Sequence, residues 1–315
     1  MTIAWVVGGG GLLGQSLNAA LALNQIKIYK PQNRFSWDDK KSLNEELLNA
    51  IQSFSRWAKE EDRWQIYWAA GIGNMHSTDG DLADETSTLA YFVELLISAS
   101  SLKLSKGSFI FSSSAGAIYA ASTDKIIDEN SLPATLNSYG LHKLEQEKLA
   151  SRLAEIDKGI TVLLARISTL FGIAQSSKKN QGLISEIARK AIRGDVIHIY
   201  VPLQTMRDYI SADEVARAMV MTTLSIEGKE AIFMKIIASE KSISIAEIIA
   251  TYKRLLRKNI KVITKLSNST AGYKKIVQFR SIRLAHIIPK SNLSLCSEVA
   301  KLINHEKTII GGGKG

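Results

Sequence analysis

Cysteine is almost absent from this chain, and its scarcity excludes two kinds of site. Cys296 is the only cysteine among 315 residues, so no internal disulfide can form. The five histidines are scattered, and none is spaced with Cys296 as the ligands of a structural zinc site are. We therefore expect no bound metal.

The first apolar stretch of the sequence is too short to cross a membrane. Residues 3–7 are apolar, whereas a membrane-spanning helix needs about 20 such residues. No basic residue precedes them, and glycines follow them in place of a small-residue cleavage site. We interpret residues 3–7 as a buried strand of a cytoplasmic protein and expect no membrane association.

Positive charge is in excess, but it is not clustered. The chain has 40 Lys and Arg against 30 Asp and Glu, which gives a formal net charge of +10. Basic chains often bind nucleic acid or phosphorylated ligands. Here the cations are spread along the chain with a modest concentration over residues 253–283, and no RNA-binding signature is present. We expect a solvated basic surface on an enzyme and no nucleic-acid partner.

Apolar strand-like runs alternate with helix-like runs through the first half of the chain. Strands are predicted over 3–7, 26–29, 64–69, 108–113 and 160–167, and helices over 12–23, 43–58, 82–101 and 138–156. Parallel strands need a helix between them, so this alternation predicts an α/β fold with a doubly wound parallel sheet. After about residue 170 the pattern loosens to a basic helix over 183–193 and short strands over 196–200, 232–237 and 261–264.

A run of four glycines follows the first strand in "WVVGGGGLLGQSL", residues 5–17. Gly8, Gly11 and Gly14 are spaced G-x-x-G-x-x-G, and Gly9, Gly11 and Gly14 also satisfy G-x-G-x-x-G. Between a strand and a helix, such glycines allow a tight turn, close approach of backbone N–H groups to a pyrophosphate, and close packing of the helix on the strand. The helix N-terminus adds partial positive charge. The loop therefore predicts dinucleotide binding.

The end of the second strand lacks the carboxylate that accepts the ribose 2′-OH of NAD. Lys30 and Arg34 lie there instead. A cation at this position would pair with a 2′-phosphate, so both residues favour NADP over NAD, although both could also be solvated surface cations. Asp38 is a candidate for contact with the adenine and could equally cap the helix that follows.

A tyrosine and a lysine lie one turn apart in "SYGLHKLEQEKL", residues 138–149. The spacing of Tyr139 and Lys143 puts both side chains on one face of the predicted helix. A phenol titrates near ~10, and a neighbouring ammonium lowers that pKa toward the range useful for proton transfer. The pair could also be coincidental on an amphipathic helix, and this helix alone does not decide.

Three serines end the apolar strand in "SFIFSSSAGAIYA", residues 108–120. Ser114 lies 25 positions before Tyr139, at the carboxyl edge of the predicted sheet, where open α/β sheets bind their ligands. A hydroxyl there can bond a substrate oxygen and hold it against the tyrosine. This context favours a catalytic reading of Tyr139 and Lys143.

With these motifs in this order, the chain resembles the extended short-chain dehydrogenase/reductase family, the NAD-dependent epimerase/dehydratase group with many nucleotide-sugar enzymes. The resemblance covers nearly the whole chain. Further matching stretches are Ala69-Ala70-Gly71, residues 128–133, "ARISTLFG" at 165–172, "RDYISADEVARAM" at 207–219 and "IIASEKSISIAEII" at 236–249.

The resemblance implies a role for each matching residue. Tyr139 would be the catalytic acid/base, Lys143 would hold the nicotinamide ribose, and Ser114 would bind substrate. Ser113 competes with Ser114, because an extra small residue separates the serines from Tyr119 compared with many relatives. The expected cofactor-binding residues are Gly8, Gly11, Leu12, Leu13, Gly14, Lys30, Arg34, Asp38, Ala69, Ala70, Gly71, Tyr139 and Lys143.

The resemblance also implies two regions and a substrate site. Residues 1–168 would form a Rossmann-type NAD(P)-binding domain and residues 169–315 a smaller substrate-binding region, with part of 205–237 returning to the first. The expected substrate-binding residues are Ser114, Thr169 and Arg207. Arg207 matches a position that contacts phosphates in several nucleotide-sugar members, and pairing with Asp208 or Asp213 is its alternative.

Two departures from the family pattern narrow the reaction. Ala115 and Gly116 follow Ser114, where 4,6-dehydratases have one or two carboxylates, so we expect no dehydratase. Thr169 replaces a frequent asparagine that helps to hold the nucleotide sugar, which weakens that substrate assignment but not the hydride chemistry.

The resulting hypothesis is an NAD(P)-dependent oxidoreductase or epimerase. Its substrate would be a sugar nucleotide or a similar hydroxy or keto compound, in surface-polysaccharide synthesis, and the choice between epimerase and reductase stays open. The alternative is a non-catalytic NADP-binding regulator of the same fold. Family resemblance also implies a homodimer through the helices around 82–101 and 138–156.

Overall fold

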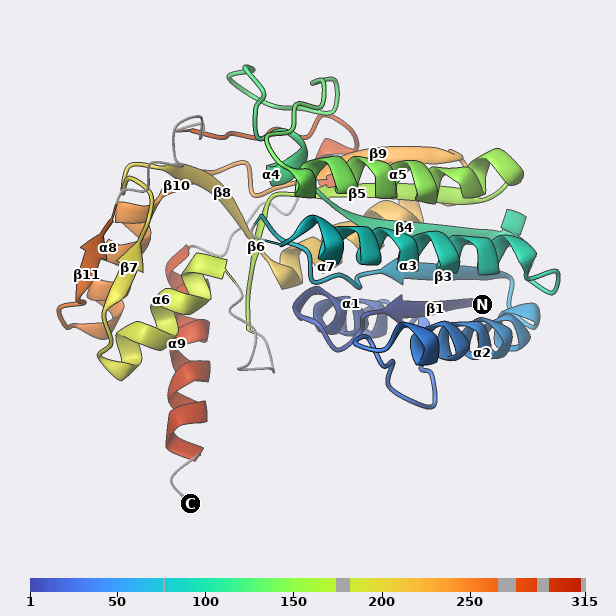
Figure 1. The fold of residues 1–315 in the computed structure, drawn as a ribbon, viewed down its shortest axis with the longest axis horizontal. Coiled ribbons are helices and arrows are strands. Elements are labelled where there is room, and N and C mark those ends of the chain that lie inside the picture. Colours follow the sequence, from blue (N-terminus) through green and yellow to red (C-terminus); the bar gives the residue numbers. More distant parts are fainter. Residues whose placement is uncertain (76, 103, 174–181, 266–275, 288–294, 313–315) are drawn as a thin grey trace.

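Six parallel strands form the central sheet in the computed structural model of the chain (Figure 1). The structure describes residues 1–75, 77–102, 104–173, 182–265, 276–287 and 295–312. In spatial order the strands are β2 (Lys27–Tyr29), β1 (Thr2–Val7), β3 (Arg63–Trp68), β4 (Gly107–Ser114), β5 (Thr161–Ile167) and β9 (Ile232–Ile237). All seven residues of β5 are buried, as expected for a strand covered on both faces.

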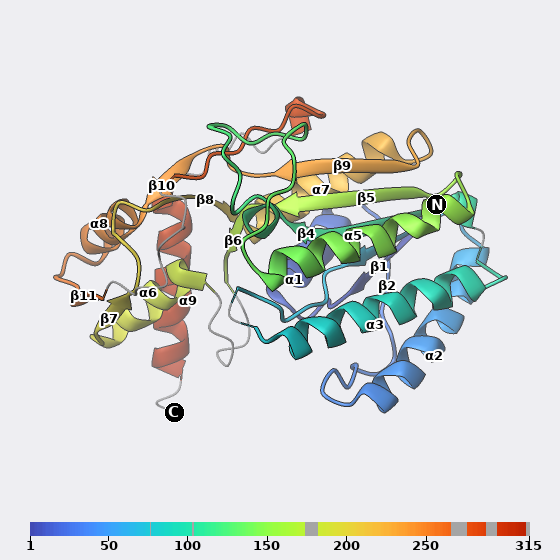
Figure 2. The same cartoon turned by 45° about the horizontal axis from the view of Figure 1, so that its top comes forward.

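Helices cover both faces of the sheet. On one face α1 (Leu12–Leu23) packs against α7 (Ala212–Ile226), and on the other α3 (Asp79–Ser98) packs against both α2 (Lys40–Lys59) and α5 (Ser138–Ile156) (Figures 1 and 2). A separate apolar core lies under each layer. The expected α/β fold with a doubly wound parallel sheet is confirmed.

Local capping sets where the helices begin. Helix α3 begins earlier than the expected 82, because Thr78 and Asp81 form a reciprocal capping box. Asp39 caps α2 by accepting hydrogen bonds from the backbone N–H groups of Lys41 and Ser42. The alternative that Asp38 caps this helix is therefore wrong, since the helix begins at Lys40 and its N-cap is the residue after Asp38.

A smaller region lies beside the carboxyl ends of the sheet strands (Figure 1). Its helices α6 (Gly182–Arg193), α8 (Ile245–Leu256) and α9 (Leu295–Gly312) pack together over a core of their own. A parallel pair of short strands completes it, β7 (Ile197–Ile199) and β11 (Val262–Thr264). Among the described residues, no helix has the length and apolar character needed to cross a bilayer.

A three-stranded sheet links the two regions. Its order is β10 (Ser242–Ser244), β8 (Met206–Ser211) and β6 (Thr169–Phe171), with β8 antiparallel to β10 and parallel to β6. The chain then returns to the large sheet, because α7 follows β8 directly and β9 pairs with β5. Helix α7 and strand β9 therefore pack with the large sheet, although they follow β8 in the chain.

Candidate functional site

The strand order places a crevice at the ends of β1 and β3. The connection after β1 crosses one face through α1, and the connection after β2 crosses the other face through α2. The two crossovers diverge at β1, which makes the carboxyl ends of β1 and β3 the topological switch point where such sheets bind ligands.

The glycine loop turns at this point and lies against the residues that follow β3. Gly8 has φ +84°, and a Cβ on it would lie 2.6 Å from the Ala70 nitrogen and 2.7 Å from the Ala69 oxygen. The turn closes through a 2.9 Å hydrogen bond from the Gly11 nitrogen to the Gly8 oxygen. Gly11 is the N-cap of α1 and provides no side-chain cap, so the first N–H groups of α1 are open to an anion.

Gly14 allows α1 to pack against this turn, and substitution there tests the packing. A Cβ on Gly14 would lie 2.2 Å from the Gly8 oxygen, whereas a Cβ on Gly10 has no atom within 4 Å. We expect Gly14→Ala to lower the free energy of unfolding by about 3 kcal/mol through overpacking against backbone. Gly10→Ala, the matched control, should change it by less than about 0.5 kcal/mol. Urea unfolding measures both, and equal stabilities would contradict the close packing.

The other expected cofactor residues differ in what they offer. Leu13 is buried in the core beneath α1, so only its backbone is available to a ligand, and Leu12 is half-buried. Lys30 follows β2, which is paired to β1, and Arg34 and Asp38 lie in the exposed segment after it. Within the part of the chain that the structure describes, Lys30 and Arg34 have no ion-pair partner.

The two candidate serines at the end of β4 differ in surroundings. Ser113 is buried, and its hydroxyl donates a 2.6 Å hydrogen bond to Glu147 Oε1. Ser114 is half-buried at the N-cap of the short helix α4 (Ala115–Ile118), where its Oγ accepts from the Ala117 nitrogen at 3.3 Å. The Ser114 hydroxyl hydrogen has no acceptor in the described chain, which favours Ser114 as the residue that meets a ligand.

Helix α5 places Tyr139 and Lys143 on one face. Asn137 caps the helix by accepting from the Gly140 nitrogen at 3.1 Å, so Tyr139 lies in its first turn. Tyr139 is half-buried, and a Cβ on Gly73 would lie 3.4 Å from its Cε2. The Nζ of Lys143 lies 5.8 Å from the centre of the Tyr139 ring. Tyr139 therefore packs beside the loop that begins with Ala69, Ala70 and Gly71.

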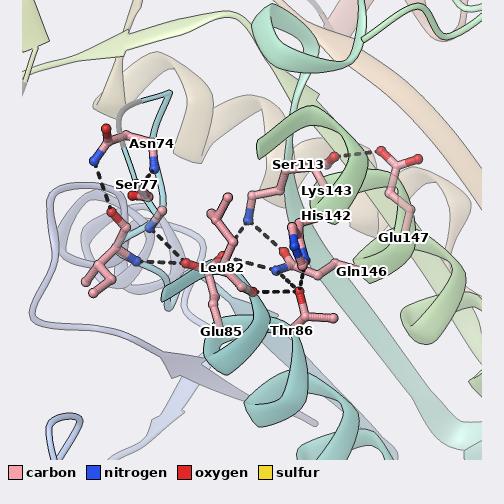
Figure 3. Close-up of polar contacts among 12 residues, drawn as sticks. Asn74, Ser77, Leu82, Glu85, Thr86, Ser113, His142, Lys143, Gln146 and Glu147 are labelled. Atoms are coloured by element: carbon pink, nitrogen blue, oxygen red, sulfur yellow. Dashed lines mark hydrogen bonds and ion pairs between the residues drawn. The ribbon is translucent and has the colours of Figure 1, made fainter. Parts of the chain in front are cut away.

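Lys143 is buried and charged, and it is paired across two helices (Figure 3). Its Nζ donates to Glu85 Oε1 of α3 at 3.0 Å and to Gln146 Oε1 at 2.8 Å. Burial lowers the pKa of Lys143, but the charges of Glu85, Tyr139 and Glu147 together raise it above its usual value. Lys143 is thus held as an ammonium beside Tyr139.

A second buried ion pair, between Arg166 and Glu147, lies next to the end of β4. Arg166 of β5 donates through Nε to Glu147 Oε1 at 2.9 Å and through Nη2 to Glu147 Oε2 at 2.7 Å. Its Nη1 donates to the Tyr119 hydroxyl. Since Ser113 bonds the same Glu147 carboxylate, this network fixes the strand end that carries Ser114.

The expected substrate residues of the smaller region lie on the linking sheet. Thr169 begins β6 opposite Tyr209, and Arg207 lies in β8 opposite Ile243. The carboxylates of Asp208 and Asp213 accept hydrogen bonds from other residues, from Ser168 at 2.7 Å and from Ser16 at 2.6 Å respectively.

Glu85 and Gln146, which contact Lys143, are candidate site residues that sequence analysis missed. Lys143 and Gln146 are three residues apart on α5, a spacing that signals contact, whereas Glu85 lies 58 residues from Lys143 with no pattern to connect them. No group of three or more His, Cys, Asp or Glu among the described residues could hold a metal ion.

Comparison with known proteins gives a consistent set of similarities. The model of the NAD dependent epimerase/dehydratase family matches residues 4–232. A dTDP-4-dehydro-6-deoxyglucose reductase from Escherichia coli is 32% identical over 149 residues, which are 47% of this chain and 46% of the reductase. The chain thus spans about half the length of that relative. A putative UDP-glucose 4-epimerase from Methanocaldococcus jannaschii is 27% identical over 225 residues, 69% of this chain and 72% of the epimerase.

Solved structures share the fold over nearly the whole chain. MoeE5 in complex with UDP-glucose and NAD has a TM-score of 0.77 at 17% identity, covering 98% of this chain and all of MoeE5. RMD from Pseudomonas aeruginosa complexed with NADPH has a TM-score of 0.77 at 19% identity, with the same coverage. The expected Rossmann-like fold is confirmed by these similarities.

Proposed function

We propose, from the premise that this chain belongs to the NAD dependent epimerase/dehydratase family, that it is an NAD(P)-dependent epimerase or reductase of sugar nucleotides. One continuous set of contacts carries the proposal. Gly8 lies against Ala69 and Ala70, and Gly73, a few residues further on, lies against Tyr139. These contacts support a single site that includes the predicted pyrophosphate loop and the predicted proton donor.

In this proposal the protein positions the reactants and moves one proton. The first N–H groups of α1 bind the pyrophosphate of the cofactor, Lys143 donates to the nicotinamide ribose, and Ser114 orients the reacting substrate oxygen. Tyr139 takes or gives the proton at that oxygen. The bound nicotinamide supplies or accepts the hydride at the adjacent carbon.

The residues around Ser114 argue against a dehydratase. Elimination of water needs a carboxylate near the strand end, and Ala115 and Gly116 follow Ser114 instead. The buried Glu147 already binds Ser113 and Arg166.

The sugar-nucleotide class is supported by the relatives, of which one is named a reductase and one a putative epimerase. We propose that Thr169 and Arg207, which lie on the linking sheet, bind the substrate together with Ser114.

Incubation with sugar nucleotides tests the reaction class. The purified protein is mixed with UDP-glucose or UDP-glucuronic acid and NAD⁺ or NADP⁺, and separately with a 4-keto sugar nucleotide and NADH or NADPH. A reductase lowers the absorbance at 340 nm in proportion to substrate, whereas an epimerase forms a new sugar without net absorbance change. Mass analysis of any nucleotide released on denaturation identifies the cofactor. Absence of both nicotinamide binding and turnover would refute the proposal.

We further propose that the cofactor is NADP in preference to NAD, held by Gly8 to Gly14, Lys30, Arg34 and Asp38. Lys30 and Arg34 are exposed at the end of β2, beside the switch point, with no ion-pair partner among the described residues. We expect wild-type protein to bind NADP⁺ more tightly than NAD⁺, and Lys30→Ala with Arg34→Ala to lose about tenfold for NADP⁺ only. Calorimetric titration with both dinucleotides measures this. Equal losses for NAD⁺ would contradict recognition of the 2′-phosphate.

We also propose a cytoplasmic homodimer. Helices α3 and α5 pack side by side on the outer face of the sheet, and Leu141 of α5 is 59% exposed there. A second copy covering this face would bury that apolar surface. Light scattering tests the assembly, since a mass near 34.6 kDa in place of twice that value would exclude the dimer.

A further inference from the structure

Four hydrogen-bond donors surround the Glu85 carboxylate. Its Oε1 accepts from Lys143 Nζ at 3.0 Å and from Gln146 Nε2 at 3.2 Å. Its Oε2 accepts from the backbone nitrogens of Ile72 at 3.0 Å and Gly73 at 2.9 Å. The side chain is only 9% exposed, and Figure 3 shows Glu85 beside Gln146 and Lys143. One buried carboxylate thus joins the lysine of the site to the loop beside the site.

Gly73 lies so close to Glu85 and Tyr139 that a side chain at this position would meet both residues. A Cβ on Gly73 would lie 3.0 Å from Glu85 Oε2 and 3.4 Å from Tyr139 Cε2. The Glu85 carboxylate and the Tyr139 ring both lie on the side of Gly73 where a side chain would extend, with Leu82 Cδ2 2.8 Å from the same point. Displacement of Glu85 would remove the acceptor of the Ile72 and Gly73 N–H groups, at the residue that lies nearest Tyr139 in this segment.

Lys143 satisfies two of its three ammonium hydrogens inside the protein, through Glu85 and Gln146. Among the described residues, the third has no hydrogen-bond acceptor. The groups that face the ammonium are Glu85 from α3, Tyr139 and Glu147 from α5, and the ring of Phe111 from β4 at 5.3 Å. Glu85 is the carboxylate in direct contact, so it largely sets the position and the charge balance of Lys143.

We propose that Glu85 is a positioning residue of this site: its carboxylate is the counter-ion that holds Lys143 beside Tyr139 and anchors the 72–73 segment against the same tyrosine. This inference rests on the proposed function for the roles of Lys143 and Tyr139. Only an ionised carboxylate suits the position, because all four neighbours are donors. A glutamine would turn its NH₂ group toward one of the two donor pairs.

The charges agree with this arrangement. Burial would raise the pKa of Glu85, but Lys143, the Gly73 N–H and Gln146 together hold it below its usual value. Glu85 is therefore ionised at neutral pH, and it keeps the buried Lys143 protonated. The pair carries no net charge, which lets it persist in a buried site.

The first test measures Lys143 directly, without any ligand. The ¹³Cε signals of labelled lysines are followed against pH, and the Lys143 signal is identified by its loss in Lys143→Met. In Glu85→Gln we expect Lys143 to titrate at lower pH than in wild-type protein, since burial remains and the counter-ion is gone. In Glu85→Asp, which keeps the charge on a shorter side chain, we expect a smaller shift. An unchanged Lys143 titration in Glu85→Gln would overturn the proposal.

The second test asks whether Glu85 acts through Lys143 on cofactor binding. Dissociation constants for NAD⁺ and NADP⁺ are measured by calorimetry for wild-type protein, Glu85→Gln, Lys143→Met and the double variant. We expect Glu85→Gln to weaken binding about tenfold and the double variant to bind as Lys143→Met does, because the two changes remove one interaction. If the losses of affinity in Glu85→Gln and Lys143→Met multiply in the double variant, the proposal is overturned.

A matched control separates this role from a general effect on α3. Glu94 lies on the same helix, is 52% exposed, and pairs with Arg152 at the surface. Glu94→Gln should change neither the Lys143 titration nor the dissociation constants, and circular dichroism confirms that each variant is folded. If wild-type protein binds neither dinucleotide, the proposed function fails, whereas the Lys143 titration still decides whether Glu85 is its counter-ion.

Discussion

Tyr139→Phe is expected to lower kcat about 1,000-fold while leaving the fold and the affinity for the cofactor nearly unchanged. The substitution removes one oxygen from a half-buried ring in the first turn of α5 and leaves its packing beside Gly73 intact. In the proposed mechanism the hydroxyl is the group that moves the proton at the reacting oxygen, so its loss leaves the hydride transfer without that proton transfer. Lys143 stays paired with Glu85 and Gln146, so the contact with the cofactor that we propose for it should be retained.

Turnover of the sugar nucleotide identified by the incubation above measures this effect, together with calorimetric titration of the cofactor. Tyr91→Phe is the matched control, because Tyr91 lies on α3 and its hydroxyl makes only a 3.5 Å contact with the Asn44 oxygen. The control should keep nearly full activity. Activity of Tyr139→Phe within tenfold of wild type would show that the proton moves by another route.

Arg166→Met is expected to lower the free energy of unfolding by about 3–5 kcal/mol. Arg166 and Glu147 have side-chain exposures of 9% and 6%, and they are joined by two hydrogen bonds. Removing the guanidinium leaves the Glu147 carboxylate buried without its counter-ion, with the Ser113 hydroxyl as a remaining donor. Methionine fills a similar space, so the loss reports mainly on the uncompensated charge.

Urea unfolding measures this loss, and a surface pair provides the control. Arg152 lies on α5, is 42% exposed, and pairs with Glu94. Arg152→Met should cost less than about 1 kcal/mol, because exposed ion pairs contribute little. Similar losses in both variants would mean that the buried network does not hold the end of β4.

The local signals in the sequence predicted much of the large sheet and the glycine turn between β1 and α1. The helices expected over 12–23 and 138–156 have these same bounds, and the strand expected over 232–237 is β9. Periodicity and glycine spacing are local properties of the sequence. Because helices cover both faces of the sheet, its strands are apolar runs that are easy to recognise. The family followed from the order of short motifs, and the match to residues 4–232 confirms it.

The linking sheet escaped sequence analysis for a physical reason. Strands β6 and β10 have three residues each, which is too short for an alternating pattern to be distinguished. They exist because β8 pairs with both: Thr169 pairs with Tyr209, 40 positions later in the chain, and Asp208 pairs with Ser242, 34 positions later. Such pairing depends on tertiary contacts and leaves no local signature.

The candidate site likewise has features that local sequence predicts and features that depend on tertiary contacts. The sequence by itself determined a glycine turn before a helix, a tyrosine and a lysine one turn apart, and hydroxyls at a strand end, because each depends on neighbours within a few residues. Only the tertiary structure decided that Ser113 is bound to Glu147 while Ser114 is not, and that Glu85 holds Lys143. These choices join α3, β4 and α5, whose side chains meet only after the sheet has brought distant segments of the chain together.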